Sequence, residues 1–591
     1  MRRHGSHNGW RAVVVATALL FLAPAGATAG DAGDKFDRVA GARARALTGR
    51  SRVIVQFSGA PDVRAIIGNH GVAGRTLEVI DAQVAEIDNI HLLALAADPR
   101  VRRIVIDRGA VGTTERTGAA IGATLVRQEL RLTGRDVGVA VVDSGISASH
   151  EDLIDHGRGS RTGRRVVYFR DFTSEALGRG RTNRPADGYG HGTHVAGIIA
   201  GNGFLSNGAR KGIAPGASLI GLKVLDAEGR GYVSDIIAAI DHGIAIRKTY
   251  NLRVMNISVA SGVYESYETD PVAQATRRAV EAGIVVVASA GNLGTDDKGN
   301  TRSGGITSPG NAPWVLTVGA ASHEGTAARH DDIIARFTSR GPTRFDRVAK
   351  PDIVAPGVGI ESLVDPRSYF YTAYADYLLD GTRPSAHKPY LGLSGTSMSA
   401  PVVAGTVALM LEANPDLTPN AVKAILQYTA EKRSGESLLS QGAGLLNARG
   451  AIRMARFFAS PSQGVPQPVD RIEGELIAWG QEIIWGDRRF AGGVPLPGAT
   501  AWNLEVPWGA GSAPGGRDIV FGVEAAAADG LLWGNNDDGL LWGDDDEGLL
   551  WGNDDEGLLW GNDDDGLLWG NDDEGLLWGN TVMEHRERTR K

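Results

Sequence analysis

Short apolar runs alternate with stretches of helical periodicity between residues 134 and 458 of this chain. The apolar runs have the length of buried strands and fall at 137–142, 218–224, 254–259 and 284–288. Apolar positions recur every three to four residues in the other stretches, which predicts helices at 194–200, 233–246, 271–282, 402–412 and 417–427. This alternation is typical of an α/β fold in which a parallel sheet has helices on both faces. Active groups of such folds gather at the carboxyl ends of the strands.

A smaller unit with a different pattern precedes this region. Its sequence predicts strands and helices at short spacing, namely strands at 53–57, 84–87 and 101–106 and helices at 60–70 and 90–97. We therefore expect a small α+β unit ahead of the larger fold. Residues 109–118 follow it and are polar and rich in turn formers, which suits a processing site.

The C-terminal part of the chain is repetitive. Residues 460–469 contain three prolines, and we expect the stretch 459–528 to be a linker and irregular extension. In the tail 529–591, tryptophan recurs every nine residues in the unit Gly-Leu-Leu-Trp-Gly-Asn-Asp-Asp-Glu, at Trp533, Trp542, Trp551, Trp560, Trp569 and Trp578. This period favours short strands stacked as a solenoid or β-roll. A disordered acidic tail is the alternative, and the sequence leaves both open.

The first 29 residues have the features of an export signal. Three arginines precede the apolar run 12–22, and Ala-Thr-Ala at 27–29 provides a small-x-small cleavage site. The run is too short to span a bilayer comfortably, and no other apolar stretch reaches spanning length. We expect a signal peptide at 1–29 and a secreted mature protein without a membrane span.

The charge is unevenly distributed along the chain. The formal net charge is −8, but residues 529–580 hold sixteen acidic residues and no lysine or arginine. The rest has 53 acidic and 61 basic residues, and these bases are dispersed, so no nucleic-acid partner is expected. The absence of cysteine excludes disulfides, thiolate catalysis and thiolate metal sites.

Two polar side chains closely follow predicted strands. Asp143 ends the run 137–142 and precedes Ser-Gly-Ile, and Asn292 follows the run 284–288 in Ala-Ser-Ala-Gly-Asn. A carboxylate in such a position is often an ordinary turn residue, and Asp143 taken alone would be interpreted in that way. Together, the two residues place a carboxylate and an amide at one edge of the predicted sheet.

A histidine pair and a serine complete the set. His191 and His194 lie three residues apart and could ligate a metal, but no carboxylate lies between them in the metalloprotease manner. Ser397 lies in Gly-Thr-Ser-Met-Ser-Ala-Pro before an apolar helix, where unpaired N–H groups and the helix dipole favour negative charge. Pro401 suits the first turn of that helix. A serine-rich helix cap is the alternative, because a hydroxyl needs an oriented base to become a nucleophile.

In the order Asp143, His191, Asn292 and Ser397, these motifs resemble those of the subtilisin family of serine proteases. Three further segments match the family, namely Gly-Ile-Ala-Pro-Gly-Ala at 212–217, Phe-Thr-Ser-Arg-Gly-Pro at 337–342 and Lys-Pro-Asp-Ile-Val-Ala-Pro-Gly at 350–357. The resemblance covers an expected peptidase domain at 118–458 and implies a three-layer, subtilisin-like sheet. It also implies that residues 30–117 form a propeptide that acts as chaperone and inhibitor.

The resemblance implies a role for each of these residues. Ser397 attacks the scissile carbonyl, His191 takes the proton and returns it to the leaving amine, and Asp143 holds the imidazole. Asn292 and the Ser397 N–H hold the oxyanion. An extended substrate is expected to pair as a strand with the backbone of Ser258, Val259 and Ala260. The opposite wall of the first specificity pocket is expected to be formed by Ala288, Ser289, Ala290 and Gly291.

Three further positions carry expectations of their own. His194 is expected to be a packed structural histidine. Subtilases usually have glycine where Ala260 stands, so the added methyl group is expected to narrow the first specificity pocket. The insert 366–390 contains five tyrosines and is either a lid or a packed surface loop, which the sequence leaves open.

The expected partners are polypeptide substrates and the chain's own propeptide, and the mature protein is expected to be a monomer. No cofactor is required for the proposed chemistry, and no metal site is expected at the catalytic residues. The loop 202–210 does not align with the family's calcium loop. Calcium is predicted only for the C-terminal repeats, because clustered carboxylates such as those at 544–547 repel one another unless a cation or solvent screens them.

Two functions remain in view at this point. The first is a secreted serine endopeptidase made as a zymogen. The second is a surface- or matrix-binding protein with a vestigial protease domain and a functional repeat tail. The complete set of catalytic residues argues against a dead enzyme.

Overall fold

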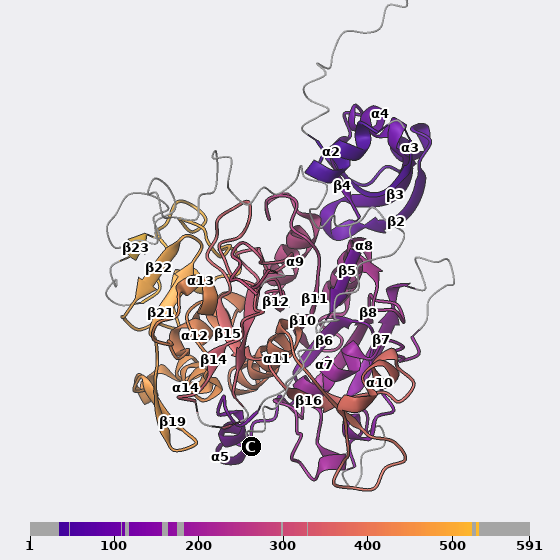
Figure 1. Cartoon of the computed structure of the whole chain (residues 1–591). Coiled ribbons are helices and arrows are strands. Elements are labelled where there is room, and N and C mark those ends of the chain that lie inside the picture. Colours follow the sequence, from indigo (N-terminus) through magenta and orange to yellow (C-terminus); the bar gives the residue numbers. More distant parts are fainter. Residues whose placement is uncertain are drawn as a thin grey trace, which may run out of the picture.

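The computed structural model describes residues 35–46, 48–107, 109–112, 118–156, 163–173, 183–296, 299–324, 326–327, 329–522 and 528–530. These residues form an α/β body, an N-terminal unit set against it and a C-terminal extension (Figure 1). The predicted signal peptide at 1–29 and the repeats from residue 531 onward lie outside the described residues.

The body is built on one eight-stranded sheet, which confirms the predicted α/β class. The strand order is β14-β13-β12-β10-β6-β8-β7, with β15 paired to β13. Every pair is parallel except β13 with β14. The four predicted strands are β6, β8, β10 and β12. The full set is β6 (Gly138–Asp143), β7 (Val166–Asp171), β8 (Ser218–Lys223), β10 (Leu252–Ile257), β12 (Val285–Ser289), β13 (Leu316–Ser322), β14 (Ile333–Ile334) and β15 (Ile353–Pro356).

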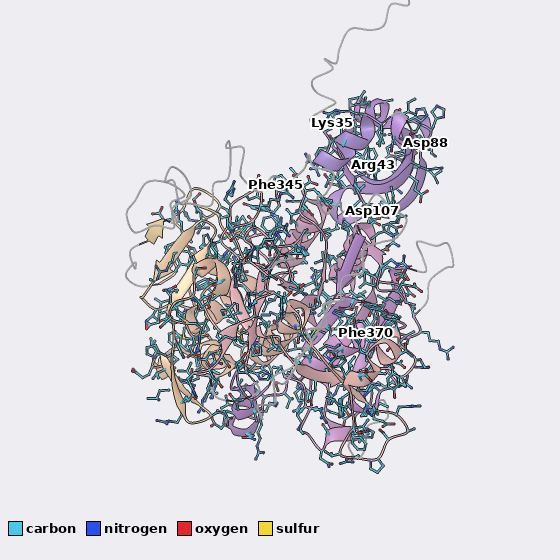
Figure 2. All side chains as sticks on the ribbon, in the orientation of Figure 1. Lys35, Arg43, Asp88, Asp107, Phe345 and Phe370 are labelled. Atoms are coloured by element: carbon cyan, nitrogen blue, oxygen red, sulfur yellow. The ribbon has the colours of Figure 1, made fainter. Side chains whose placement is uncertain are left out.

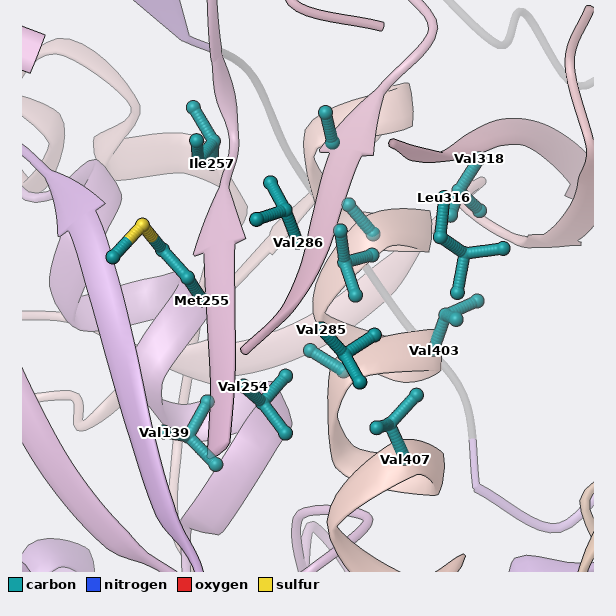
Figure 3. Close-up of a cluster of buried hydrophobic side chains, with 14 of the residues drawn as sticks. Val139, Val254, Met255, Ile257, Val285, Val286, Leu316, Val318, Val403 and Val407 are labelled. Carbon is teal, nitrogen blue, oxygen red and sulfur yellow. The ribbon is translucent and has the colours of Figure 1, made fainter. Parts of the chain in front are cut away.

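Helices cover both faces of this sheet, and alternate side chains of β10 show the two layers. The side chain of Met255 lies against Gly243 of α8. Its neighbour Val254 lies on the side of Val407 of α11, in a cluster of buried hydrophobic side chains (Figure 3). Successive strand residues point to opposite faces, so each face has its own apolar layer. The main helices are α7 (His191–Ala200), α8 (Val233–Ile246), α9 (Pro271–Glu281), α11 (Thr396–Ala413), α12 (Pro419–Thr429) and α14 (Ala448–Ala459).

Helix α11 begins earlier than predicted. It spans Thr396–Ala413 rather than 402–412, so Pro401 lies inside the helix and not in its first turn. Proline has no N–H to bond the carbonyl four residues earlier, which is that of Ser397. The hydroxyl of Ser258 donates to that carbonyl at 2.7 Å instead, which satisfies the group that proline leaves open. Among the described residues, α11 is the one helix long and apolar enough to cross a membrane, but 89% of the window is buried inside the body, as in a core helix.

The N-terminal unit is the predicted α+β unit, with one strand more than the sequence indicated. Its antiparallel sheet has the order β2-β3-β1-β4. One face of that sheet packs on α3 and α4, and apolar side chains of its other face join the main core, beside α8 and α9. The elements are α2 (Arg38–Ala44), β1 (Arg50–Phe57), α3 (Val63–Gly68), β2 (Val72–Leu77), β3 (Ala82–Asp88), α4 (Leu92–Ala96) and β4 (Val101–Ile106).

Polar contacts fix this unit on the start of α8. Asp107, at the junction of the two parts in Figure 2, accepts a 2.7 Å hydrogen bond from the backbone N–H of Ser234. Arg52 donates to the same carboxylate at 2.7 Å, and Arg75 forms a 2.8 Å ion pair with Asp235. A carboxylate at a helix N-terminus satisfies open N–H groups and complements the helix dipole, so Asp107 of the N-terminal unit caps a helix of the body.

The C-terminal extension is more ordered than predicted, and the expected linker and irregular extension at 459–528 is corrected for its described part. Four tryptophans of this stretch are buried in the same core as α12 and α14, and each indole N–H donates a hydrogen bond; they are Trp479, Trp485, Trp502 and Trp508. An indole buries a large apolar area, which offsets the cost of ordering a proline-rich segment. The strands are β19 (Val469–Ile472), β20 (Glu475–Ala478), β21 (Glu482–Trp485), β22 (Arg488–Ala491) and β23 (Ala528–Gly530).

Two small three-stranded sheets lie beside the main one. Their orders are β11-β5-β9 and β16-β18-β17. The first joins the N-terminal part of the chain to the body, and the second precedes α11. Their strands are β5 (Gly109–Gly112), β9 (Gly231–Tyr232), β11 (Val259–Ala260), β16 (Ile360–Leu363), β17 (Leu378–Leu379) and β18 (Tyr390–Leu393).

Candidate active site

Three neighbouring strands of the main sheet end at one level. The register pairs Val142 of β6 with Ile257 of β10, and Ile257 with Ala288 of β12. Asp143 and Ser258, which follow these paired residues in β6 and β10, therefore lie side by side at the carboxyl edge. Helix α7 starts beside the end of β6, α11 starts beside the ends of β10 and β12, and the two helices pack together.

Asp143 and His191 form a buried pair at this edge. Nδ1 of His191 lies 2.7 Å from Oδ1 of Asp143, and both side chains are fully buried. The backbone N–H of Ser144 donates to the same carboxylate oxygen at 2.7 Å. A carboxylate accepting from Nδ1–H fixes the tautomer in which Nε2 carries the lone pair. The pair therefore presents a basic nitrogen on the far side of the imidazole.

The start of α7 is held by a buried network that the sequence analysis missed. Asp187 accepts hydrogen bonds from the backbone N–H groups of Gly190 and Thr193, at 2.8 Å each, and from the Ser144 hydroxyl at 2.9 Å. That hydroxyl accepts from the N–H of Gly192 at 2.9 Å. The network fixes the backbone on both sides of His191. Asp187 comes seven residues before the predicted helix at 194–200 and four before the observed start of α7, and it was the available signal because acidic residues favour helix N-termini.

Asn292 contacts the residue that precedes Ser397 at the start of α11. Ser397 is the second residue of the helix and is buried. The Oδ1 atom of Asn292 accepts from the backbone N–H and the hydroxyl of Thr396, both at 3.0 Å, and the N–H of Gly291 donates to that hydroxyl at 3.1 Å. With Oδ1 turned toward Thr396, the amide donors on Nδ2 are at the opposite end of the group. Sequence reasoning missed Thr396, although it adjoins the serine.

The segment predicted to hold an extended substrate already holds a strand of this chain. β5 lies between β11 and β9 and is antiparallel to both. Val259 pairs with Gly112 and Ala260 pairs with Val111, while Gly109 pairs with Tyr232. The backbone from Ser258 onward is thus arranged to add a peptide as a strand.

The second predicted segment, residues 288–291, comprises the last two residues of β12 and the two residues that follow it. Ala288 and Ser289 belong to the strand itself, and Ala288 is part of the main core. Ala290 accepts a 3.1 Å hydrogen bond from the N–H of Thr307. Gly291 has φ +103°, and a Cβ there would lie 2.8 Å from side-chain atoms of Thr307 and Ser339, so only glycine fits.

His194 faces away from this chemistry. Its Nε2 lies 3.0 Å from the carbonyl oxygen of Leu391, its Nδ1 has no hydrogen-bond partner within the described part of the chain, and complete burial lowers its pKa to about 3. Its expected structural role is therefore supported. Among the described residues, no group of three or more histidine and acidic side chains is placed to hold a metal ion.

We expect His194 to make the fold sensitive to acid. The unfolded chain binds a proton on this residue near pH 6.5 and the folded chain only near pH 3, so stability is full above 6.5 and falls as the pH drops toward 3. Between pH 6.5 and 5 this amounts to about 2 kcal/mol. Urea unfolding at pH 7.5 and pH 5, in an inactive Ser397→Ala background, should show a loss smaller by that amount in His194→Gln. Equal losses with and without the substitution would contradict the assignment.

Comparison with known proteins shows the family of the chain. A sequence profile described as "Subtilase family" matches residues 134–444. The chain is 38% identical over 375 residues to Serine protease AprX of Bacillus subtilis (strain 168), covering 62% of this chain and 78% of that protein. It is 31% identical over 411 residues to Subtilisin E of the same organism, covering 69% and 90%.

A solved structure has the same fold. This is fervidolysin from Fervidobacterium pennivorans, described as a keratinolytic enzyme related to subtilisin, with a TM-score of 0.51 and 23% sequence identity. The match covers 74% of this chain and 64% of that chain. With the family profile spanning more than half of its length, the chain belongs to the subtilase family of serine proteases.

Proposed function

We propose that the protein is a secreted serine endopeptidase, made as a zymogen, that cleaves peptide bonds through Asp143, His191 and Ser397. The observation that carries this proposal is the buried 2.7 Å pair of Asp143 and His191, at the strand edge where the helix of Ser397 begins. A serine becomes a nucleophile when a base lies within reach and a third group orients that base.

The proposed reaction assigns a step to each of these groups. His191 Nε2 takes the proton of Ser397 Oγ as Oγ bonds to the substrate carbonyl carbon, and Asp143 stabilises the imidazolium. The tetrahedral oxyanion accepts from Asn292 Nδ2 and the N–H of Ser397. The carbon–nitrogen bond then breaks, and the imidazolium gives its proton to the leaving amine. Water then bonds to the acyl carbon while His191 takes its proton; the carbon–Oγ bond breaks, the acid product leaves and His191 returns the proton to Ser397 Oγ.

The zymogen part of the proposal rests on the N-terminal unit. β5 pairs with β11, where a substrate strand is expected, and Asp107 and Arg75 anchor the unit on α8. We infer a propeptide at 30–117 that folds against the body and blocks the substrate segment until it is cleaved and released. Secretion, through a signal peptide at 1–29, is part of the same proposal, as are a monomeric mature enzyme and calcium binding by the tail.

A fluorophosphonate tests the proposed nucleophile. Such a probe phosphonylates a serine only when a base activates it. Mass spectrometry of the digested mature protein should place the adduct on the peptide that contains Ser397. A His191→Ala variant should not be labelled. Caseinolytic activity without an adduct on Ser397 would refute the proposal.

A separate prediction concerns Asn292. Asn292→Ala should lower kcat about 10²–10³-fold with little change in KM, because the donor acts on charge that develops in the transition state; the magnitude comes from subtilisin, a member of this family. Asn292→Asp keeps the oxygen that accepts from Thr396 but removes the donors. It should be at least as inactive as the alanine variant. Near-normal activity of Asn292→Asp would mean that the residue serves only to hold Thr396.

A further inference from the structure

The tyrosine-rich insert, residues 366–390, is packed against the loop that leads into His191. It leaves β16, forms the short helix α10 (Tyr369–Ala373) and returns through β17 and β18 to α11. The start of the insert, at Ser368 and Phe370, is buried, whereas most residues from 372 to 388 are exposed. The insert therefore lies on the direct chain connection to the nucleophile.

Backbone hydrogen bonds join the insert to that loop. The N–H of Tyr369 donates to the carbonyl of Gly188 at 2.7 Å, and the N–H of Phe370 donates to the carbonyl of Tyr189 at 3.0 Å. The contact is close enough to exclude a side chain at Gly190, which has φ +106°; a Cβ there would lie 3.0 Å from Cβ of Phe370. The start of the insert and the three residues before His191 are thus joined by direct contacts.

A second contact joins the end of the insert to α7, the helix that begins at His191. The carbonyl of Leu391 in β18 accepts from Nε2 of His194, at 3.0 Å, one turn into α7. Six residues later the chain reaches Ser397. The segment between Tyr369 and Ser397 therefore connects the loop of the proposed base with the proposed nucleophile through bonded contacts.

One side chain of the insert lies directly beside the imidazole. The ring of Phe370 meets that of His191 edge to face, with centroids 6.2 Å apart and planes at 85°, and Phe370 is only 3% exposed. Tyr189 packs on Phe370, with ring centroids 4.5 Å apart, and lies 6.5 Å from the His191 ring. Figure 2 shows Phe370 on the body, in the part that holds α10.

We propose that Phe370 is a positioning residue that fixes the ring plane of His191. The hydrogen bond from Nδ1 to Asp143 sets one point of the imidazole but leaves rotation about that contact. Packing against a buried phenylalanine restricts this rotation and aims Nε2 at Ser397. Small errors in such an aim are costly, since about 1 Å of misplacement lowers a rate about 100-fold. This inference rests on the proposed role of His191 as base.

Kinetics of Phe370→Ala test the inference. With a soluble peptide substrate, kcat should fall about 10–100-fold while KM stays within about twofold, because the substrate is still bound but the base is misaligned. Phe370→Leu, which keeps a large apolar side chain, should restore kcat to within about threefold of the wild type. Tyr377→Ala is the matched control, an aromatic residue of the same insert that is 43% exposed, and it should leave kcat unchanged.

The rate of fluorophosphonate labelling provides an independent reading. Labelling of Ser397 needs the base but no bound peptide, so it should slow in Phe370→Ala in parallel with kcat. A kcat within twofold of the wild type, a loss confined to KM, or a leucine variant no better than alanine would each overturn the inference. If the alanine variant does not fold, Phe370→Val takes its place under the same criteria. A wild-type protein that is neither labelled nor active would instead refute the proposed function.

Discussion

Ser397→Ala should abolish peptide hydrolysis, with kcat lowered about 10⁶-fold, a magnitude known from subtilisin itself. The substitution removes the atom that forms the acyl-enzyme, while the buried helix start tolerates the smaller side chain. The same variant should accumulate as an unprocessed precursor, because no other proposed nucleophile exists to cut the chain. Casein hydrolysis and the mass of the secreted protein measure the two effects together.

A neighbouring serine provides the control for this variant. Ser399 lies two residues further along α11 and is equally buried. Ser399→Ala should keep activity within a few-fold of the wild type and should be processed normally. If Ser399→Ala were inactive and Ser397→Ala active, the nucleophile would be misassigned. Normal processing of Ser397→Ala would show that another protease removes the propeptide.

Asp143→Asn should lower kcat about 10⁴-fold at neutral pH and leave the fold intact. The amide has the shape of the carboxylate, but its Nδ2 donates to Nδ1 of His191. The imidazole then carries its proton on Nε2 and has no lone pair to accept the proton of Ser397. The same amide also loses the charge that stabilises the imidazolium.

Steady-state kinetics and thermal unfolding separate chemistry from stability in this variant. We expect a normal unfolding temperature, an unchanged KM and a much reduced kcat. Fluorophosphonate labelling of Ser397 should slow by a similar factor. A loss of less than tenfold would mean that Asp143 does not set the tautomer and that the turn interpretation of this residue was correct.

The predicted and observed folds agree where a polar residue directly follows a clear apolar strand pattern. Asp143 and Asn292 could be placed because each follows a run of apolar residues that only a buried strand explains. The start of α11 could not be placed in this way. The preference of proline for the first turn of a helix takes no account of hydrogen bonds from residues far away in the sequence. The hydroxyl of Ser258, 139 residues earlier, satisfies the carbonyl that Pro401 leaves open, and this allows the helix to begin at Thr396.

The parts of the site that escaped prediction depend on contacts between segments far apart in the sequence. Asp187 is close to His191 in the chain, but its hydrogen bond from Ser144 comes from another strand end. Phe370 gave no signal at all, since nothing in a tyrosine-rich insert indicates which ring will meet an imidazole. The extension was misread for a related reason: its prolines indicated a linker, but its tryptophans bond to residues elsewhere in the extension and pack on α12 and α14.

The placement of β5 between two strands of the body has a kinetic consequence. A segment held by backbone pairing on both sides is present at its binding site at an effective concentration that does not depend on how many molecules share the solution. In each newly folded chain, the substrate segment would thus bind its own β5 before any other protein. Maturation would then proceed at a rate that does not depend on the protein concentration. Under the proposed function, an external substrate would compete only after that strand has left.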